Sequence, residues 1–321
     1  MVEKNGIHKK NKILIGSNGG LTGIYLARKL KKLDNVILYG ADSSDICTGK
    51  FFVDKQMYLP NAKEEKFIER LIDLFESEKI DIYLPTHSEE IKVIAMNEFE
   101  IRKLSKVEFV VSPYETFEAL NDKLAANFSL HQVGIPVPKL IEGLSKDYPI
   151  LMKSREGSGS RGVTLIENSA IHKAYLDTCV DRVFFQLIHG KEYTADCLFD
   201  KEGNLVGFNQ RQRLKTIGGA VTVSQNDYCF NIEPWIRKIA GSWIFRGCVN
   251  FQYIVENGIP YFIDINLRYP SGGLPLTVQS GFDIPKLVVQ LLLDEPIVFE
   301  YGKFKSSEIK MYRYYEEIFE E

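Results

Sequence analysis

The sequence has no long hydrophobic run. Its longest apolar stretch, Leu287–Leu293, is interrupted by Gln290 and followed by Asp294. That stretch is far shorter than the roughly 18 apolar residues that a membrane span needs. Near the N-terminus only Ile13, Leu14 and Ile15 precede a glycine cluster, which is too few for the apolar core of a signal peptide. We therefore expect a cytoplasmic protein without a membrane-spanning or targeting segment.

Cysteine is scarce, and neither sign of charge is in excess. The 321 residues include five cysteines, an odd number without any C-x-x-C pair. This pattern predicts reduced thiols and not a disulfide framework. Lys plus Arg number 40 and Asp plus Glu 43, so the net charge is -3 and the excess of positive charge typical of nucleic-acid-binding proteins is absent. We expect no nucleic-acid partner.

The first 112 residues alternate short apolar runs with helical patterns. Apolar runs occur at 12–15, 36–39, 82–84 and 107–111, and helical patterns at 22–33, at 64–78 and after Ser88. Strands separated by helices of this length indicate βαβ units. The sequence predicts an α/β protein whose first domain, residues 1–112, is a small Rossmann-like parallel sheet.

A glycine cluster follows the first apolar run, between Gly16 and Gly23. Asn18 stands where the dinucleotide-binding motif G-x-G-x-x-G has its second glycine, and its side chain would crowd a pyrophosphate. Asp42, after the second apolar run, could imitate the ribose-binding acid of that motif. The spacing nevertheless favours a tight turn between strand and helix over a nicotinamide dehydrogenase.

A second domain is expected to begin at Ser112-Pro113, a sequence typical of a helix start. We expect one helix from there to about Gln132, where Gly134 and two prolines end it. From Pro149 the pattern changes to alternating strands with hairpin turns. The sequence thus predicts an α+β domain over 113–300, largely antiparallel, and a C-terminal tail over 301–321.

A second glycine cluster lies in the loop Lys153–Val163. A loop rich in glycine and serine offers several backbone N–H groups, which suit the oxygens of a triphosphate. It is not a Walker A loop, because Val163 stands where that motif requires lysine and a strand follows. A glycine-rich surface hairpin is the alternative interpretation.

Three later side chains could hold a metal ion. Asp264 and Asn266, two residues apart in a predicted strand, present oxygen atoms on one face, with Ile263 and Ile265 on the other. We predict a hairpin with a three-residue, bulged loop, which would set Gln252 beside Asp264. Such oxygen ligands suit Mg²⁺, which substrate phosphates and water commonly complete. A half-buried strand with ordinary polar positions is the alternative.

The order of these elements resembles the ATP-grasp superfamily, most closely its carbamoyl-phosphate-synthase-like branch. The resemblance rests on Lys123, on Lys153 with its glycine loop, on Gln186–Glu192, on Gln252 and on Asp264-x-Asn266-x-Arg268. It covers nearly the whole chain, and residues 1–112 are similar to the domain that precedes the ATP-grasp fold. A mobile lid over about 120–185 is implied.

The resemblance also implies roles for individual residues. The ATP-binding residues would be Lys123, Lys153, Ser158, Gly159, Ser160, Gly162, Gln186, Leu187, Ile188 and Glu192. Mg²⁺ would be held by Gln252, Asp264 and Asn266, with aspartate replacing the commoner glutamate at 264. Arg268 would stabilise the transferring phosphoryl group. Arg211, Arg213 and Lys215 would form a phosphate or carboxylate clamp, for which a solvated basic edge strand is the alternative.

The activity that this resemblance implies is ATP- and Mg²⁺-dependent joining of a carboxylate to an amine through an acylphosphate. A phosphotransferase of the carbamoyl-phosphate-synthase type and a non-catalytic ATP-binding regulatory module are the alternatives. The partners would be a small carboxylate and a small amine. Dimerisation is common in similar proteins, so a homodimer is an expectation as well.

Overall fold

The computed structural model describes residues 10–155, 163–179, 181–297 and 309–320. The predicted ATP ligands Ser158, Gly159, Ser160 and Gly162 lie outside the described residues. The chain divides into two compact units. The first comprises Met1–Tyr114 and Asp283–Phe299, and the second Glu115–Phe282 and Glu300–Glu321. The segment from Asp283 thus belongs to the first unit, whereas the sequence pattern placed it in the second domain.

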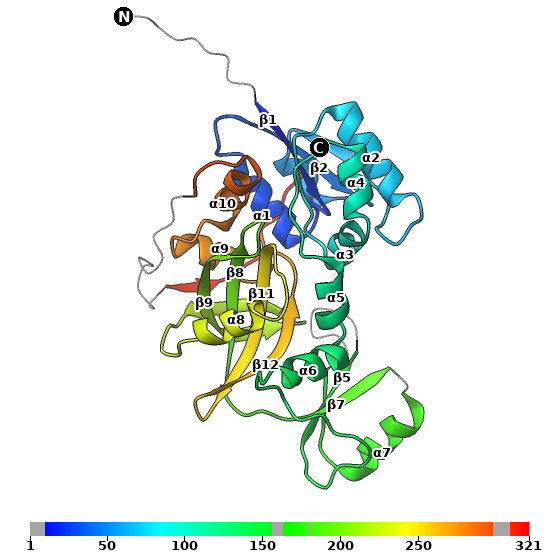
Figure 1. The fold of residues 1–321 in the computed structure, drawn as a ribbon, viewed down its shortest axis with the longest axis vertical. Helices are drawn as coiled ribbons and strands as arrows, with labels where there is room; N and C mark the ends of the chain where they lie inside the picture. Colours follow the sequence, from blue (N-terminus) through cyan, green and yellow to red (C-terminus); the bar gives the residue numbers. More distant parts are fainter. Residues whose placement is uncertain (1–9, 156–162, 180, 298–308, 321) are drawn as a thin grey trace, which may run out of the picture. The chain divides into compact units, whose positions relative to one another are not determined.

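The first unit contains the predicted parallel sheet (Figure 1). Its strand order is β3-β2-β1-β4, and all three pairings are parallel. The strands are β1 (Asn11–Gly16), β2 (Val36–Asp42), β3 (Lys55–Tyr58) and β4 (Ile82–Leu84). The helices are α1 (Leu21–Leu30), η1 (Thr48–Phe52), α2 (Phe67–Glu78), α3 (Ser88–Met96), α4 (Glu98–Leu104) and α10 (Ile284–Leu292). The strand expected at 107–111 is reduced to a single bridge between Ile82 and Glu108.

The first glycine cluster forms a turn whose polar groups are satisfied within the unit. Asn18 is fully buried, and its Nδ2 donates to Gln56 Oε1 at 2.8 Å. Asp42 accepts a hydrogen bond from the Gly19 backbone N–H at 3.0 Å. A Cβ atom on Gly40 would lie 2.1 Å from the Asn18 amide, so this glycine leaves room for the asparagine. The residues that could have served a dinucleotide instead hold the turn together.

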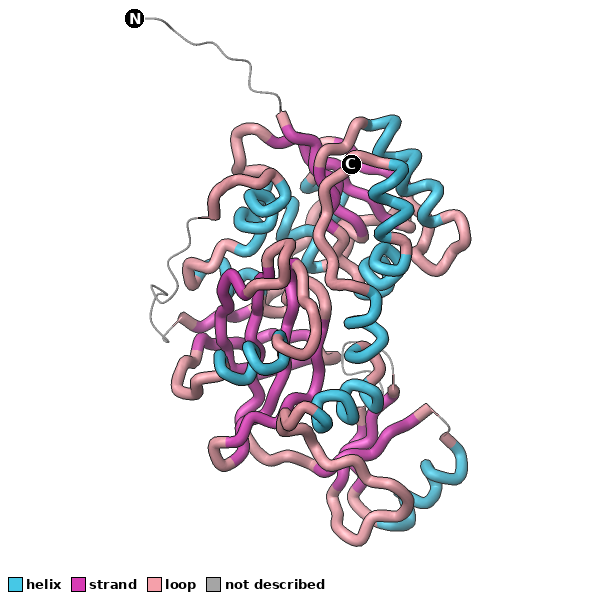
Figure 2. Tube along the Cα trace, viewed as in Figure 1, coloured by secondary structure: helices cyan, strands magenta, loops and turns pink. Residues whose placement is uncertain are grey.

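The second unit is built on a six-stranded antiparallel sheet with the order β12-β11-β8-β9-β10-β13 (Figures 1 and 2). Its strands are β8 (Lys191–Phe199), β9 (Leu205–Ile217), β10 (Ala220–Asn226), β11 (Gly247–Glu256), β12 (Ile259–Asn266) and β13 (Lys310–Tyr312). Two short helices, α8 (Glu233–Ala240) and α9 (Leu274–Gln279), accompany it. The antiparallel pattern predicted after residue 149 is confirmed.

Side chains alternate across this sheet, and its two faces differ in character. One face is apolar: Tyr193, Ala195, Phe251 and Tyr253 are at most 4% exposed. The opposite face is polar, and the registers of four strands align its residues in two rows. The first row is Arg211, Thr194, Gln252 and Asp264, and the second is Asn209, Asp196, Asn250 and Asn266.

One predicted helix is two helices. The structure has α5 (Tyr114–Leu120) and α6 (Lys123–Gln132) where the sequence pattern indicated one continuous helix. Asp122 breaks the continuity, because its side chain accepts hydrogen bonds from the N–H groups of Leu124 and Ala125 and so caps a new helix. Its other oxygen is 2.9 Å from Arg155 Nε. The break places Lys123 in the first turn of α6.

A separate three-stranded sheet of the second unit has the order β6-β5-β7 and is flanked by α7 (Ser169–Thr178) (Figure 2). Its strands are β5 (Ile150–Ser154), β6 (Thr164–Ile166) and β7 (Arg182–Gln186). Its core contains Ile150, Met152, Ile166 and Phe184. We refer to this sheet and helix as the lid sheet; its motion stays a prediction.

His172 is a neutral histidine buried in the lid sheet. Its ring centroid lies 4.4 Å from that of Phe184, and its Nδ1 is 3.0 Å from the Tyr148 hydroxyl. Burial lowers the pKa of His172 below its ordinary value of 6.5. The unfolded chain therefore takes up the proton more readily than the folded one. The contribution of His172 to stability is fully present above about pH 6.5 and is lost as the pH decreases from there.

We expect the unfolding temperature of the protein to fall as the pH is lowered from 7 to 5. The variant His172→Gln, which cannot take up this proton, should show a shallower decrease. Thermal unfolding of both proteins across that pH range measures the difference. Parallel curves for the two proteins would contradict the assignment of this pH dependence to His172.

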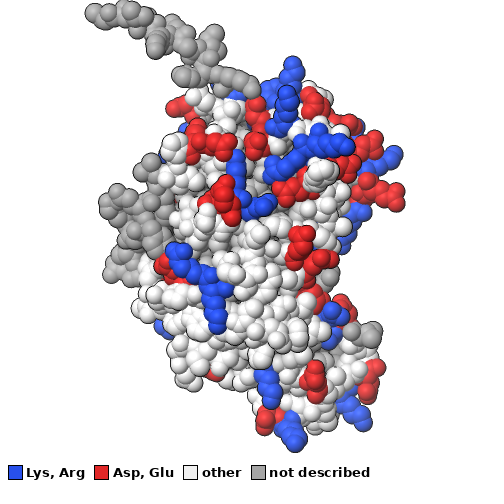
Figure 3. All heavy atoms as spheres, in the orientation of Figure 1, with Lys and Arg blue, Asp and Glu red and all other residues white. Residues whose placement is uncertain are grey.

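Neither the charges on the face drawn in Figure 3 nor the described helices indicate a nucleic-acid or membrane partner. On that face, lysine and arginine are interspersed with aspartate and glutamate. Within the described residues, every helix is too short or too polar to cross a bilayer.

Candidate active site

A cavity of about 230 Å³ lies over the polar face of the central sheet, within the second unit. Side chains from four regions line it: α6, the lid sheet, the β9–β10 hairpin, and β11 and β12 with the turn after β12. The lining residues are Lys123, Lys153, Ser154, Val163, Arg211, Arg213, Gly218, Gly219, Ala220, Val221, Asn250, Gln252, Ile263, Asp264, Asn266, Arg268, Pro270, Ser271 and Gly272. Both predicted lysines, the three predicted metal ligands, Arg268 and the clamp residues Arg211 and Arg213 are therefore in one cavity, whereas Lys215 of the clamp is not among its lining residues.

The predicted pairing of Gln252 with Asp264 is confirmed, but its cause differs from the one expected. Asn257 and Gly258 form a two-residue turn, with positive φ angles of 51° and 78°. The bulge lies inside the hairpin, where the register shifts between Gln252 and Tyr253 and leaves Ile263 as the extra residue. As a result Ile263 lines the same cavity as Asp264, not the opposite face that simple alternation predicted.

Two lysines from different elements approach the Asp264 end of the cavity. Lys153 extends from β5 and is 9% exposed, and its ammonium group lies 5.9 Å from the centroid of the Phe185 ring. Burial lowers the pKa of Lys153; the negative charge of Asp264 opposes this shift, and the positive charge of Lys123 adds to it. A buried lysine with a second lysine nearby provides a site that an anion such as phosphate would stabilise.

Asp264, Asn266 and Arg268 form a chain of hydrogen bonds along the end of β12. Asn266 Nδ2 donates to Asp264 Oδ2 at 3.1 Å, and Arg268 Nη2 donates to Asn266 Oδ1 at 3.3 Å. Arg268 also donates to Ser271 Oγ at 3.1 Å. Burial lowers the pKa of Arg268, and the charge of Asp264 opposes that shift. The arginine is thus largely removed from solvent and held between Asn266 and Ser271.

The donor set around Asp264 fits one hard divalent ion. It offers one carboxylate and the amide oxygen of Gln252, whose Nε2 is directed to Glu192. The Asn266 oxygen is engaged by Arg268 and would have to exchange that bond for a metal. Among the described residues no cluster of three His, Cys, Asp or Glu side chains could hold a metal. One ion completed by phosphate oxygens and water therefore fits better than a pair.

Glu192, predicted as the ribose ligand, lies at the edge of this group. Its Oε1 accepts a hydrogen bond from Gln252 Nε2 and forms an ion pair with Arg213 Nε at 2.7 Å. Arg213 Nη2 donates to the Gly219 carbonyl at 3.1 Å. Burial lowers the pKa of Arg213, and Glu192 opposes the shift. Glu192 therefore orients Gln252 and Arg213, and its contact with a ribose stays a prediction.

The basic strand of the clamp is not a solvated edge strand. β9 lies between β8 and β10, and Arg211 is 1% exposed. Gly218 and Gly219 have φ angles of 55° and 78° and close a two-residue turn between Ile217 and Ala220.

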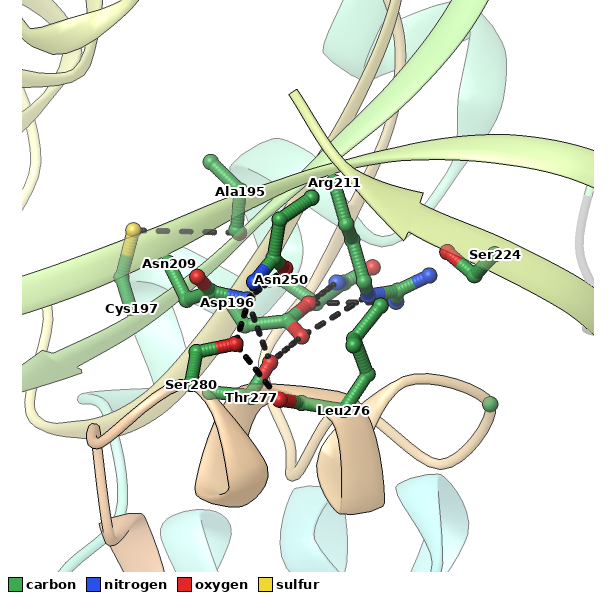
Figure 4. Close-up of polar contacts among 12 residues, drawn as sticks. Ala195, Asp196, Cys197, Asn209, Arg211, Ser224, Asn250, Leu276, Thr277 and Ser280 are labelled. Atoms are coloured by element: carbon green, nitrogen blue, oxygen red, sulfur yellow. Dashed lines mark hydrogen bonds and ion pairs between the residues drawn. The ribbon is translucent and has the colours of Figure 1, made fainter. Parts of the chain in front are cut away.

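Arg211 belongs to a buried polar network (Figure 4). Its Nε and Nη2 donate to the two oxygens of Asp196, at 2.9 and 3.2 Å. Asp196 also accepts from Asn250 Nδ2 at 2.6 Å and from Thr277 Oγ1 at 2.5 Å. Sequence reasoning missed Asp196; the only signal was its spacing of four residues from Glu192, which places both on one strand face.

Gly273 covers the Arg211 side chain. A Cβ atom on Gly273 would lie 1.8 Å from Arg211 Nε, and Arg211 cannot move aside because Asp196 holds it. We expect Gly273→Ala to destabilise the protein by about 1–3 kcal/mol, the usual cost of overpacking. Gly241→Ala is the matched control, since its Cβ would meet no atom closer than 3.4 Å. Urea unfolding measures both, and equal midpoints would contradict this packing argument.

The remaining predicted residues lie elsewhere. Gln186, Leu187 and Ile188, at and after the end of β7, are not among the described residues that line this cavity. The Gln186 backbone N–H donates to the Lys139 carbonyl at 2.9 Å. Their contact with adenine stays a prediction.

Several known proteins are similar to this chain in sequence. A family model described as ATP-grasp in the biosynthetic pathway with Ter operon matches residues 178–312. The biotin carboxylase of Allochromatium vinosum is 25% identical over 231 residues, which cover 61% of this chain and 50% of that protein. The pyruvate carboxylase of Bacillus subtilis is 26% identical over 254 residues, 68% of this chain and 21% of that protein.

This chain matches the ATP-grasp superfamily over residues 178–312, as the motif order of the sequence predicted. It spans about half the length of the biotin carboxylases that it matches. ATP-grasp proteins of known structure share the fold of this chain, and the α/β architecture expected from the sequence is confirmed.

Two solved structures illustrate the shared fold. The biotin carboxylase domain of Hydrogenobacter thermophilus 2-oxoglutarate carboxylase, a dimer in complex with MgADP, ADP and bicarbonate, has a TM-score of 0.71 at 18% identity. That comparison covers 93% of this chain and 73% of the other. The N5-carboxyaminoimidazole synthetase of Staphylococcus aureus, complexed with ADP, has a TM-score of 0.70 at 16% identity and covers 90% and 79%.

Proposed function

We propose that this ATP-grasp protein is an ATP- and Mg²⁺-dependent carboxylate–amine ligase. The observation that carries the proposal is the convergence of Lys123, Lys153, Asp264 and Arg268 on one cavity, from α6, the lid sheet and β12. Two cations for phosphates, a carboxylate for a metal and a desolvated arginine are the groups that phosphoryl transfer requires.

The reaction would proceed in two steps. A carboxylate oxygen of the acid substrate attacks the γ-phosphorus of ATP, and ADP leaves with the electrons of the broken P–O bond. The amine nitrogen then attacks the carbonyl carbon of the acylphosphate, loses a proton and displaces phosphate. Lys123 and Lys153 would hold the phosphates, and Arg268 and Arg213 would offset charge on the transferring group and the acid.

Asp264 and Gln252, with Asn266 after it exchanges its bond to Arg268, would hold the Mg²⁺. The ion would supply neutralisation of charge on the phosphate oxygens. Because Glu192 fixes the Gln252 amide, the Gln252 oxygen is oriented before any ligand binds.

A second candidate keeps the fold but changes the acceptor. The Hydrogenobacter domain described above was solved with bicarbonate bound, so phosphorylation of bicarbonate, as in the carbamoyl-phosphate-synthase type, is the alternative. A regulatory module without turnover is less compatible with the site, because Asp264 and Arg268 lie in the same cavity as both lysines.

The test is release of ADP and phosphate from Mg·ATP by the purified protein. It is run with pooled carboxylates, with bicarbonate, and with each of these plus pooled amines, while AMP and pyrophosphate are followed in parallel. ADP release that requires both a carboxylate and an amine supports the ligase. Release with bicarbonate alone supports the second candidate, and ATP binding without any release supports the regulatory module.

The dimer of the Hydrogenobacter domain also motivates an assembly proposal. We infer that this protein forms a homodimer. Light scattering coupled to size-exclusion chromatography tests this, and a mass near 36.7 kDa, that of one chain, would contradict it.

A further inference from the structure

Two buried polar atoms on the polar face of the central sheet have no hydrogen-bond partner within the described part of the chain. They are Thr194 Oγ1 and the Nη1 atom of Arg211. Both residues are at most 1% exposed, and their Cα atoms are register partners on β8 and β9. Buried groups of this kind are costly unless something satisfies them, and in native proteins each such group calls for an explanation.

Arg211 is held so that one donor stays available. Asp196 engages Nε and Nη2, while Figure 4 shows the other terminal nitrogen pointing away from Asp196. Arg211 itself lines the cavity beside Gly218, Gly219 and Val221 of the β9–β10 hairpin. A fixed guanidinium with a spare donor is suited to recognising an anionic oxygen.

The backbone of Arg211 lies far from the end of the cavity that contains Asp264 and Arg268, where the proposed reaction would take place. In the row Arg211, Thr194, Gln252 and Asp264, three strand spacings separate the first residue from the last. At about 4.8 Å per spacing, the two backbones are roughly 14 Å apart. The Arg211 guanidinium, which bonds Asp196 on the neighbouring strand β8, is still about two spacings, roughly 10 Å, from β12. An acid substrate whose carboxylate reacts near Asp264 and Arg268 would therefore reach Arg211 only with a second group.

The charges of the cavity decide what that group can be. Among the described residues that line it, five are cationic, namely Lys123, Lys153, Arg211, Arg213 and Arg268, and Asp264 is the one acid. Near the hairpin, Asp196 already accepts four hydrogen bonds and Glu192 already pairs with Arg213 and Gln252. A substrate ammonium group would meet arginines there and no available carboxylate, whereas a second anion would meet donors.

We propose that the acid substrate is a small dianion. One carboxylate reacts at the Asp264 end, and a second anionic group, a carboxylate or a phosphate, binds Arg211 and Arg213 beneath the β9–β10 hairpin. This inference rests on the proposed ligase function. It excludes ω-amino acids and simple monocarboxylic acids as preferred acid substrates.

The test uses hydroxylamine, which traps acylphosphates as hydroxamates whatever the natural amine is. The intact protein is given Mg·ATP with acids of matched length: dicarboxylates of four to six carbons, phosphorylated hydroxy acids, monocarboxylates, and ω-amino acids. The dianions should give hydroxamate and ADP with a KM about tenfold or more below that of monocarboxylates of equal length, as expected for one charge-assisted interaction. Comparing the KM values of dicarboxylates with those of phosphorylated hydroxy acids identifies whether the second anionic group is a carboxylate or a phosphate.

Variants locate the binding site. Arg213→Gln should raise the KM for the best dianion about tenfold more than it raises the KM for a monocarboxylate of equal length. Arg237→Gln, the same substitution on an exposed helical arginine, should change neither value. An equal rise for both classes of acid would overturn the assignment of the second anion to this end.

The outcomes separate the two proposals. Hydroxamate formation that favours monocarboxylates or amino acids overturns the dianion inference and leaves the ligase proposal intact. Absence of ADP and hydroxamate with every acid, while ATP binding is measured by calorimetry, contradicts the ligase proposal and with it the inference.

Discussion

Asp264→Asn is expected to abolish turnover while leaving the protein folded. The substitution keeps the size and shape of the side chain but removes the negative charge that a metal and the phosphates would require. Removing one electrostatic element of this kind typically costs about 100- to 1,000-fold in rate. ADP release under saturating Mg·ATP and acid substrate measures the loss, and thermal unfolding verifies that the fold is retained.

Asp181→Asn is the matched control for this experiment. Asp181 is exposed at the start of β7, and the same isosteric change there should leave ADP release within about twofold of the unmodified protein. Binding of ATP without metal, measured by calorimetry, should survive in Asp264→Asn because Lys123 and Lys153 remain. A folded Asp264→Asn protein with full activity would remove the metal assignment.

Asp196→Ala is expected to destabilise the second unit strongly. Asp196 is fully buried and balances the charge of Arg211 through two hydrogen bonds, at 2.9 and 3.2 Å. Removing one partner of a buried ion pair costs about 3–5 kcal/mol, because the remaining charge stays desolvated without compensation. Asn250 and Thr277 lose an acceptor in the same substitution. A total stability of about 5–15 kcal/mol would be reduced by a large fraction.

An exposed ion pair provides the contrast. Asp73 lies 3.3 Å from Arg70 on α2, and both side chains are more than half exposed. Asp73→Ala should cost at most about 1 kcal/mol, since water screens the pair. Urea unfolding of both variants gives the comparison. Asp196→Ala with a free energy of unfolding within 1 kcal/mol of that of Asp73→Ala would show that Arg211 finds compensation elsewhere.

The local sequence pattern was sufficient to predict those parts of the fold that depend on residues close together in the sequence. Buried runs such as Ile13–Ile15 predicted the parallel strands of the first unit, because strands of a sheet covered on both faces are apolar throughout. Asn18 at a motif glycine position indicated a turn and not a dinucleotide site, and the structure shows its amide bound to Gln56. The spacing of Asp264 and Asn266 indicated a shared strand face, and both line the cavity.

Other features depended on residues that are distant in sequence. The helix break at Asp122 was missed; beside its local cap on Leu124 and Ala125, Asp122 also bonds Arg155, which is distant in sequence. The pairing of Gln252 with Asp264 was predicted from a bulge in the loop. The structure instead has a two-residue turn, and the bulge lies at Ile263 inside the hairpin.

The sequence by itself determined the superfamily, the two-part α/β organisation and the candidate residues of the phosphate end. Periodicity predicted the α/β organisation because strand and helix geometry is local, whereas the superfamily and the candidate residues came from the resemblance in motif order. Only the tertiary structure revealed that Arg211 is paired with Asp196 and keeps one donor available, and that the cavity presents five cations and one acid. Charge balance in a buried site is a property of neighbours brought together by folding, so no single segment of sequence contains it.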